Sequence, residues 1–108
     1  MLLSGPKPSI AASELQGIIE KIAYKRQVKI KNVRNKKPKI MKELNQVSLE
    51  VTFHSTLIEL TDVIYNIETS DKFLFVEDLN IHLKKSDNPE KIETKLTLNG
   101  FIENSANL

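Results

Sequence analysis

The side chains that could perform chemistry are few in this sequence and stand apart from one another. His54 and His82 are the two histidines, and neither lies at metal-ligand spacing from a second histidine or a carboxylate cluster. We therefore expect both to be solvent-facing strand residues. The adjacent Glu77 and Asp78 could hold a cation or work as an acid–base pair. Since no partner cluster accompanies them, their expected role is to accommodate a β-bulge and to discourage edge pairing.

Patterns typical of nucleophiles and phosphate sites are absent from the sequence. No serine has a G-x-S-x-G context, and no cysteine is present to form a thiolate or a disulfide. Glycine occurs only at Gly5, Gly17 and Gly100, which cannot form a phosphate-cradling loop. We predict that the chain is not an enzyme, uses no cofactor, binds no metal and takes no small-molecule substrate.

Charge is distributed unevenly along the 108 residues. Residues 1–42 carry a net charge of +9 and residues 43–108 a net charge of −7, which leaves +2 overall. The segment 25–42 alone has nine basic residues and no acidic one. A solvated loop beside an edge strand accounts for this run, and a docking face for an acidic partner protein or a nucleic-acid surface are the other interpretations.

The elements that must position these side chains come in two copies, because the hydrophobic pattern repeats after 45 residues. Each copy opens at a helical spacing and continues with the period-2 alternation of strands. The matched pairs are Leu15/Leu60, Ile18/Val63, Ile19/Ile64, Ile22/Ile67, Val28/Phe73, Ile30/Phe75, Val47/Ile92, Val51/Leu96 and Phe53/Leu98. Neither copy can bury its apolar face alone, so the two halves should share one core.

Local signals set the expected boundaries. Ser9 is the predicted N-cap of a helix that ends near Lys25, with Ser13 and Gln16 as a competing capping-box start. Thr56 with Glu59 has the spacing of a capping box for a helix that ends near Thr69. The predicted strands are 27–34, 47–54, 73–83 and 92–100, with a bulge near Glu77 and Asp78. Residues 35–46 are expected to be a loop and residues 84–91 a turn. The second helix should face the core with Leu57, Leu60, Val63, Ile64 and Ile67.

This order predicts an α+β fold: a ferredoxin-like, circularly permuted αββαββ arrangement with a four-stranded antiparallel sheet and two helices on one face. The strands beginning at Val47 and Ile92 should be central. We expect an extended lead-in at residues 1–8, left where a membrane anchor or coiled coil was removed. One domain should follow over residues 9–103, made of the repeats 9–54 and 55–103, before a frayed tail at 104–108. The predicted core comprises Leu15, Ile18, Ile19, Ile22, Leu49, Val51, Phe53, Leu60, Ile64, Ile67, Leu96 and Leu98.

Four stretches of the sequence together resemble the patterns of a known protein family. They are LTDVIYNIETS at 60–70, FLFVEDLNI at 73–81, LTLNGF at 96–101, and an entry formed by residues 3–5 and 10–16. Together they resemble the periplasmic domain of the type II secretion system protein M (GspM), subtype b, and of the related type IV pilus protein PilO. The resemblance covers roughly residues 2–103.

The resemblance implies a component of an inner-membrane assembly platform. Such proteins have one transmembrane helix, a coiled coil and a ferredoxin-like periplasmic domain, which forms homodimers and pairs with a GspL-like or PilN-like domain of the same fold. This chain has no membrane helix. We therefore expect a soluble truncation of a single-pass protein, which would touch the membrane only through a missing N-terminal helix.

Two edge strands would leave backbone groups available for such pairing. The interface candidates are Phe73, Leu74, Phe75, Val76 and Leu79 on one edge, and Val28, Lys29, Ile30, Lys31 and Arg34 on the other. The alternative function is a ferredoxin-like nucleic-acid-binding module that uses residues 25–42. The outward residues of the central strands argue against it, since they offer no aromatic ring for base stacking. They are Ser48, Glu50, Thr52, Glu93, Lys95 and Thr97. We expect no nucleic-acid partner.

Overall fold

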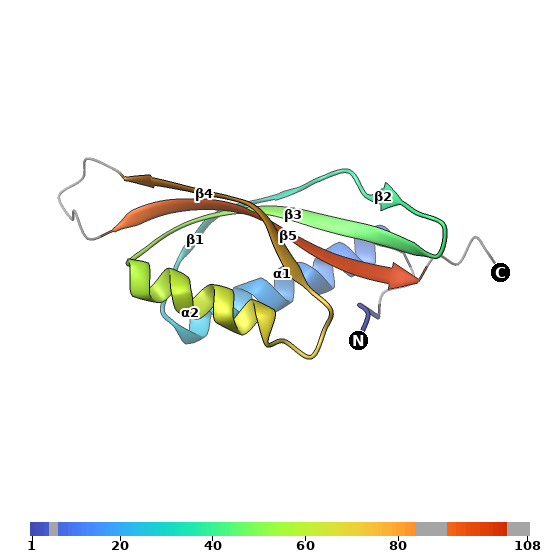
Figure 1. The fold of residues 1–108 in the computed structure, drawn as a ribbon, viewed down its shortest axis with the longest axis horizontal. Helices are drawn as coiled ribbons and strands as arrows, with labels where there is room; N and C mark the ends of the chain where they lie inside the picture. The colour runs from blue at the N-terminus through green and yellow to red at the C-terminus, as the bar shows by residue number, and fades with distance from the viewer. Residues whose placement is uncertain (5–6, 84–90, 104–108) are drawn as a thin grey trace.

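The computed structural model describes residues 1–4, 7–83 and 91–103, in which two helices cover one face of an antiparallel sheet (Figure 1). The elements in chain order are α1 (Pro8–Lys25), β1 (Ile30–Asn35), β2 (Lys39–Ile40), β3 (Leu44–Ser55), α2 (Leu57–Glu68), β4 (Phe75–Leu83) and β5 (Ile92–Glu103). The strand order is β1-β3-β5-β4, so β3 and β5 are central, as predicted. The predicted turn at 84–91 falls almost wholly outside the described residues, and the tail at 104–108 does so entirely.

The sheet has one strand more than predicted. The short strand β2 pairs with β3 through Lys39 opposite Gln46 and Ile40 opposite Asn45, inside the region expected to be a loop. Pro38 has no N–H to donate to a sheet, but it lies just before β2 and leaves the next two residues able to pair.

The helix α1 begins without a side-chain cap. Lys7 holds the N-cap position with no capping hydrogen bond, and Pro8 begins the helix, so the prediction that Ser9 caps it is wrong. Proline favours this position because its φ angle is already helical and its missing N–H would have had no helical partner. Leu15 and Ile19 are fully buried, while the predicted core residues Ile18 and Ile22 are only half-buried. Tyr24 lies exposed in the last turn.

The helix α2 begins at the predicted capping box. The Glu59 N–H donates to Thr56 Oγ1 at 3.2 Å, and the Thr56 N–H donates to Glu59 Oε1 at 2.8 Å. The prediction that Leu57 faces the core is wrong, since 64% of this residue is exposed. At 3.6 residues per turn, Leu57 lies about 90° round the helix from the centre of the buried stripe. That stripe consists of Leu60, Val63 and Ile67, and Ile64 at its margin is half-buried.

The central strands β3 and β5 pair over their whole length, from Leu44 opposite Glu103 to Ser55 opposite Ile92. The predicted inward row of β3 is buried on the helix side. It consists of Val47, Leu49, Val51 and Phe53. Leu49 lies directly opposite Leu98, and both are fully buried, so the two halves of the chain meet in one core.

Both edge strands contain an irregularity. In β4 the register shifts between Glu77 and Asn80, and Asp78 has a φ of 53°, which confirms the predicted bulge. Phe75, before the bulge, faces the open side of the sheet opposite Asn99, whereas Ile81, after it, lies opposite Thr94 on the helix side. In β1 the register against β3 shifts between Ile30 and Asn32. Before this strand, Gln27 has a φ of 57°. This left-handed residue continues the turn after α1, so β1 begins at Ile30 and not at residue 27 as predicted.

The first residues of the chain are fastened to the end of the sheet. The Leu3 N–H donates to the Phe101 carbonyl at 2.8 Å, and the Phe73 N–H donates to the Met1 carbonyl at 2.6 Å. Leu3 is only 5% exposed because it packs against Gly100, where a Cβ atom would lie 2.7 Å from Leu3 Cδ1. Gly100 therefore makes room for Leu3.

The Glu14 carboxylate completes this attachment. It accepts a hydrogen bond from the Ser4 N–H at 2.7 Å and lies 3.6 Å from Lys72 Nζ. Burial, the largest single influence, raises the pKa of Glu14, but the hydrogen bonds from Ser4 and the interaction with Lys72 together lower it below its ordinary value. None of the helices in the described ranges is long and apolar enough to cross a membrane.

Candidate functional site

Of the side chains singled out for chemistry, His54 lies in a group of charged residues on the open face of the sheet. His54 Nε2 lies 2.9 Å from Glu93 Oε2, and Lys31 Nζ lies 3.3 Å from the same oxygen. His54 and Glu93 are directly opposite in the β3–β5 register, a contact that sequence spacing alone did not reveal. Within residues 1–4, 7–83 and 91–103, no group of three His, Cys, Asp or Glu side chains could hold a metal ion.

A second set of charges lies beside the first on the open face. Arg34 Nη2 contacts Glu50 Oε2 at 3.1 Å, and Lys95 Nζ lies 3.8 Å from Glu50 Oε1. The hydrogen bond from Arg34 is the main reason that the pKa of Glu50 is lowered. These pairs link β1 to β3 and β3 to β5, so their geometry is that of a structural ladder of opposite charges.

Aromatic rings gather at one end of the open face, next to the β4 edge. The Phe101 ring centroid lies 5.7 Å from those of both Phe73 and Phe75, and Phe101 itself is buried. Phe73 is 63% exposed, and Phe75 and Leu79 are also exposed. Strand alternation could have placed Phe101 on the same face as Phe75, but the sequence analysis did not single it out.

The other two candidates of the β4 edge, Leu74 and Val76, point toward the core and not toward the open face. Leu74 and Val76 are half-buried against the core, and together with Phe75 and Glu68 they line a hollow of about 400 Å³. The outer side of β4 has no strand partner in the part of the chain that the structure describes. This edge therefore presents an apolar surface and an unpaired backbone together.

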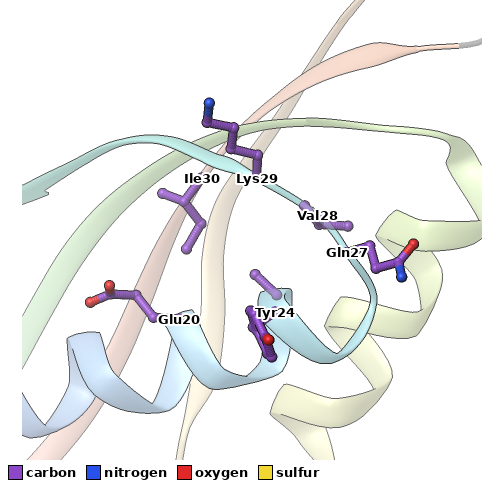
Figure 2. A pocket seen from close by; sticks show the side chains of 7 residues that line it. Glu20, Tyr24, Gln27, Val28, Lys29 and Ile30 are labelled. Atoms are coloured by element: carbon purple, nitrogen blue, oxygen red, sulfur yellow. The ribbon is translucent and has the colours of Figure 1, made fainter.

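The β1 edge has a different character. Lys29, Lys31 and Arg34 are exposed, whereas Ile30 is half-buried and Val28 is largely buried. A groove of about 350 Å³ runs between β1 and the last turns of α1. Figure 2 shows Glu20 and Tyr24 on the helix side of this groove and Ile30 on the strand side, while the Lys29 side chain extends away from the helix.

The structure does not bring these two sets of candidates together. Strands β1 and β4 are the two ends of the strand order, with β3 and β5 between them. They form two separate surfaces: a β4 surface around Phe73–Leu79, and a β1 surface around residues 28–35. Tyr24, which the sequence analysis did not select, belongs to the β1 surface.

Two solved structures of the pilus protein PilO are similar to this chain in fold. The crystal structure of the type 4 fimbrial biogenesis protein PilO from Pseudomonas aeruginosa is similar with a TM-score of 0.80 at 7% identity, covering 90% of this chain and 72% of that one. The core region of PilO from the type IV pilus system of the same organism gives a TM-score of 0.70 at 9% identity, covering 82% of this chain and 94% of that one. At these identities the likeness shows the PilO-type ferredoxin-like fold.

The sequence defines the family more closely. The model of type II secretion system (T2SS) protein M, subtype b, matches residues 1–102, so the chain belongs to this family. No curated protein matches it at the level of sequence. Proteins of this family are structural components of secretion systems, and membership implies a component of a secretion or pilus platform.

Proposed function

We propose that this chain is a periplasmic assembly domain of the inner-membrane platform of a type II secretion system, or of a type IV pilus. It acts by homo- and hetero-dimerisation and performs no catalysis. Family membership supports the platform role. The observation that carries the binding role is the β4 surface, where Phe73, Phe75 and Leu79 are exposed beside a strand edge that has no further strand partner in the described residues.

An edge of this kind favours association for two physical reasons. Unpaired N–H and C=O groups can extend the sheet into a second molecule, and natural proteins usually protect such edges with charge or a covering element. Burying exposed aromatic side chains gains about 25 cal/mol per Å² of apolar surface removed from water. The β4 surface offers both contributions in one place.

The proposed partners are a second copy of this domain and, in the native complex, a GspL-like or PilN-like domain of the same fold. The proposed contact with the membrane is through an N-terminal helix that precedes the domain. Because that tether would raise the effective concentration of the domains, the isolated domain is expected to associate weakly.

Sedimentation velocity across protein concentration, up to the millimolar range, tests this function. We expect self-association that weakens in Phe73→Ser. The matched control is Tyr65→Ser on α2, which removes an aromatic ring of nearly equal exposure, 65% against 63%, away from the β4 surface. Strictly monomeric behaviour at millimolar concentration, together with no association with a GspL-like or PilN-like domain, would defeat the proposal.

A further inference from the structure

We propose that the β1 surface binds an extended, acidic segment of a partner protein, which adds to β1 as a further strand and places an apolar side chain in the groove beside Tyr24. The inference rests on the proposed function only in that the domain works by binding proteins. It concerns the sheet edge opposite to the β4 surface and a different kind of partner.

The backbone of β1 can accept another strand. Over Ile30–Asn35 it pairs with β3 on one side, and no strand lies on its other side in the described residues. An added strand would gain main-chain hydrogen bonds along this edge, while its alternate side chains would point to the two faces of the sheet.

The charge of the β1 surface selects the partner. Three basic residues of the segment 25–42 have carboxylate partners: Arg26 with Asp62, Lys31 with Glu93, and Arg34 with Glu50. Lys29, Lys37 and Lys39 are exposed and lie within 4 Å of no carboxylate of the described residues. Two β1 edges would bring these positive charges together, which disfavours pairing between copies of this chain. An acidic strand would instead be attracted and aligned by them.

The groove sets the second requirement. Its walls include the apolar side chains of Ala23, Val28 and Ile30, and Tyr24 stands beside it with 83% of its surface exposed (Figure 2). A side chain of an added strand that points to the helix side of the sheet would enter this groove and cover part of the tyrosine ring. The fitting partner therefore alternates apolar residues, directed toward the helix side, with acidic residues.

The test uses a defined probe and the whole domain. A synthetic peptide of about eight residues, alternating valine and glutamate, matches the length and pattern of such a strand. Binding is followed at physiological salt by fluorescence polarisation and by amide chemical shifts. We expect the amides of β1 to shift, and a peptide with lysine in place of glutamate to show no binding.

Variants locate the site. Lys29→Glu is expected to weaken binding about tenfold, because it replaces an attraction at the edge with a repulsion. Tyr24→Ala should weaken it about threefold to fivefold through lost apolar contact. The matched control Lys7→Glu makes the same charge change at the other end of α1, and should alter the affinity less than about twofold.

Several results would overturn the inference. They are an equal loss in Lys7→Glu and Lys29→Glu, an unchanged affinity when alternate peptide amides are N-methylated, and tighter binding of an oligothymidine than of the acidic peptide. Phe73→Ser separates this inference from the proposed function. It should leave peptide binding intact while weakening self-association, so either interaction can fail while the other persists.

Discussion

Strands β1 and β4 occupy equivalent places in the two halves of the chain, yet they present very different edges. β1 has six residues, and its Lys31 and Arg34 are tied to glutamates of the central strands. β4 has nine residues and exposes Phe75 before its bulge, Leu79 within it and Ile81 after it. The partner proposed for the first edge is selected by charge and the one proposed for the second by apolar contact, so the two proposed interactions would not compete for one surface.

In the interior, by contrast, the two halves of the chain are alike. Each central strand has 12 residues, and each contributes a fully buried leucine to the same place, Leu49 from β3 and Leu98 from β5. A repeated unit can change its edge freely, because edge side chains contact solvent. It cannot change its inner row without disturbing the other half, because the rows pack together.

The largest effect is expected from the shared core. Leu49→Ala and Leu98→Ala should each lower the free energy of unfolding by about 2–5 kcal/mol, since each leaves a cavity in a closely packed interior. Urea denaturation followed by circular dichroism should show one transition for both variants. Two separate transitions would mean that the halves do not share a core.

A smaller effect is expected where the first residues meet the second half. Gly100→Ala should destabilise the fold by about 1–3 kcal/mol, because the new methyl group would displace the side chain of Leu3. In a Leu3→Ala background the same substitution should cost much less. Equal costs in the two backgrounds, measured as a double-mutant cycle, would show that Leu3 does not occupy the space above Gly100.

The helix starts give the next comparison. Thr56→Ala should lower stability by about 0.5–2 kcal/mol, since it removes a side-chain cap from α2. Ser9→Ala in α1 should have almost no effect, because that helix starts at Pro8 with no side-chain cap at Lys7. Thermal unfolding of the two variants, side by side, measures the difference. A larger loss in Ser9→Ala would reverse this assignment of the helix starts.

The same capping box predicts a response to acid. The hydrogen bond from the Thr56 N–H is the main cause that lowers the pKa of Glu59 below its ordinary value of 4.5. A lowered folded-state pKa stabilises the fold above the unfolded value, and this contribution is lost as the pH falls through the folded pKa. Glu59→Gln should therefore be less stable than the parent at neutral pH, and the difference should shrink below about pH 4.5. A difference that grows in acid would contradict this sign.

The smallest effect is expected on the β1 edge. Lys31→Gln should change the free energy of unfolding by less than about 0.5 kcal/mol, because exposed ion pairs contribute little to stability. Chemical denaturation measures the change, and a loss above about 1 kcal/mol would mean that the pair with Glu93 holds the edge in place. A small loss would show that the Lys31–Glu93 pair contributes little to the stability of this edge.

Features that depend on neighbouring residues could be predicted from the sequence. The capping box at Thr56 and the bulge at Asp78 are of this kind. The strand order could be predicted as well, because it follows from the repeat. Where two local signals competed, the prediction was less secure. Ser9 has a capping side chain, but the fixed φ of Pro8 had already begun α1.

Other features depend on contacts between distant segments. The pairing of His54 with Glu93 requires the register of β3 against β5, which alternation alone leaves open. Leu57 is apolar like the core residues of its helix, but it lies outside the stripe that faces the sheet. The rotation of the helix about its own axis decides which apolar residues face the sheet. The groove beside Tyr24 exists only because β1 and α1 lie next to each other. Partner binding at each of the two edges stays a prediction.

The attachment of the first residues also has a mechanical consequence. Met1 is hydrogen-bonded to Phe73 just before β4, and Leu3 is hydrogen-bonded to Phe101 in β5. A pulling force applied at Met1 would therefore be divided between a central strand and the segment that leads into the apolar edge. Tension on this end of the chain and a partner bound at the β4 surface would act on the same few residues. Tension would therefore change the affinity of the β4 surface, and a bound partner would change the force needed to detach Met1.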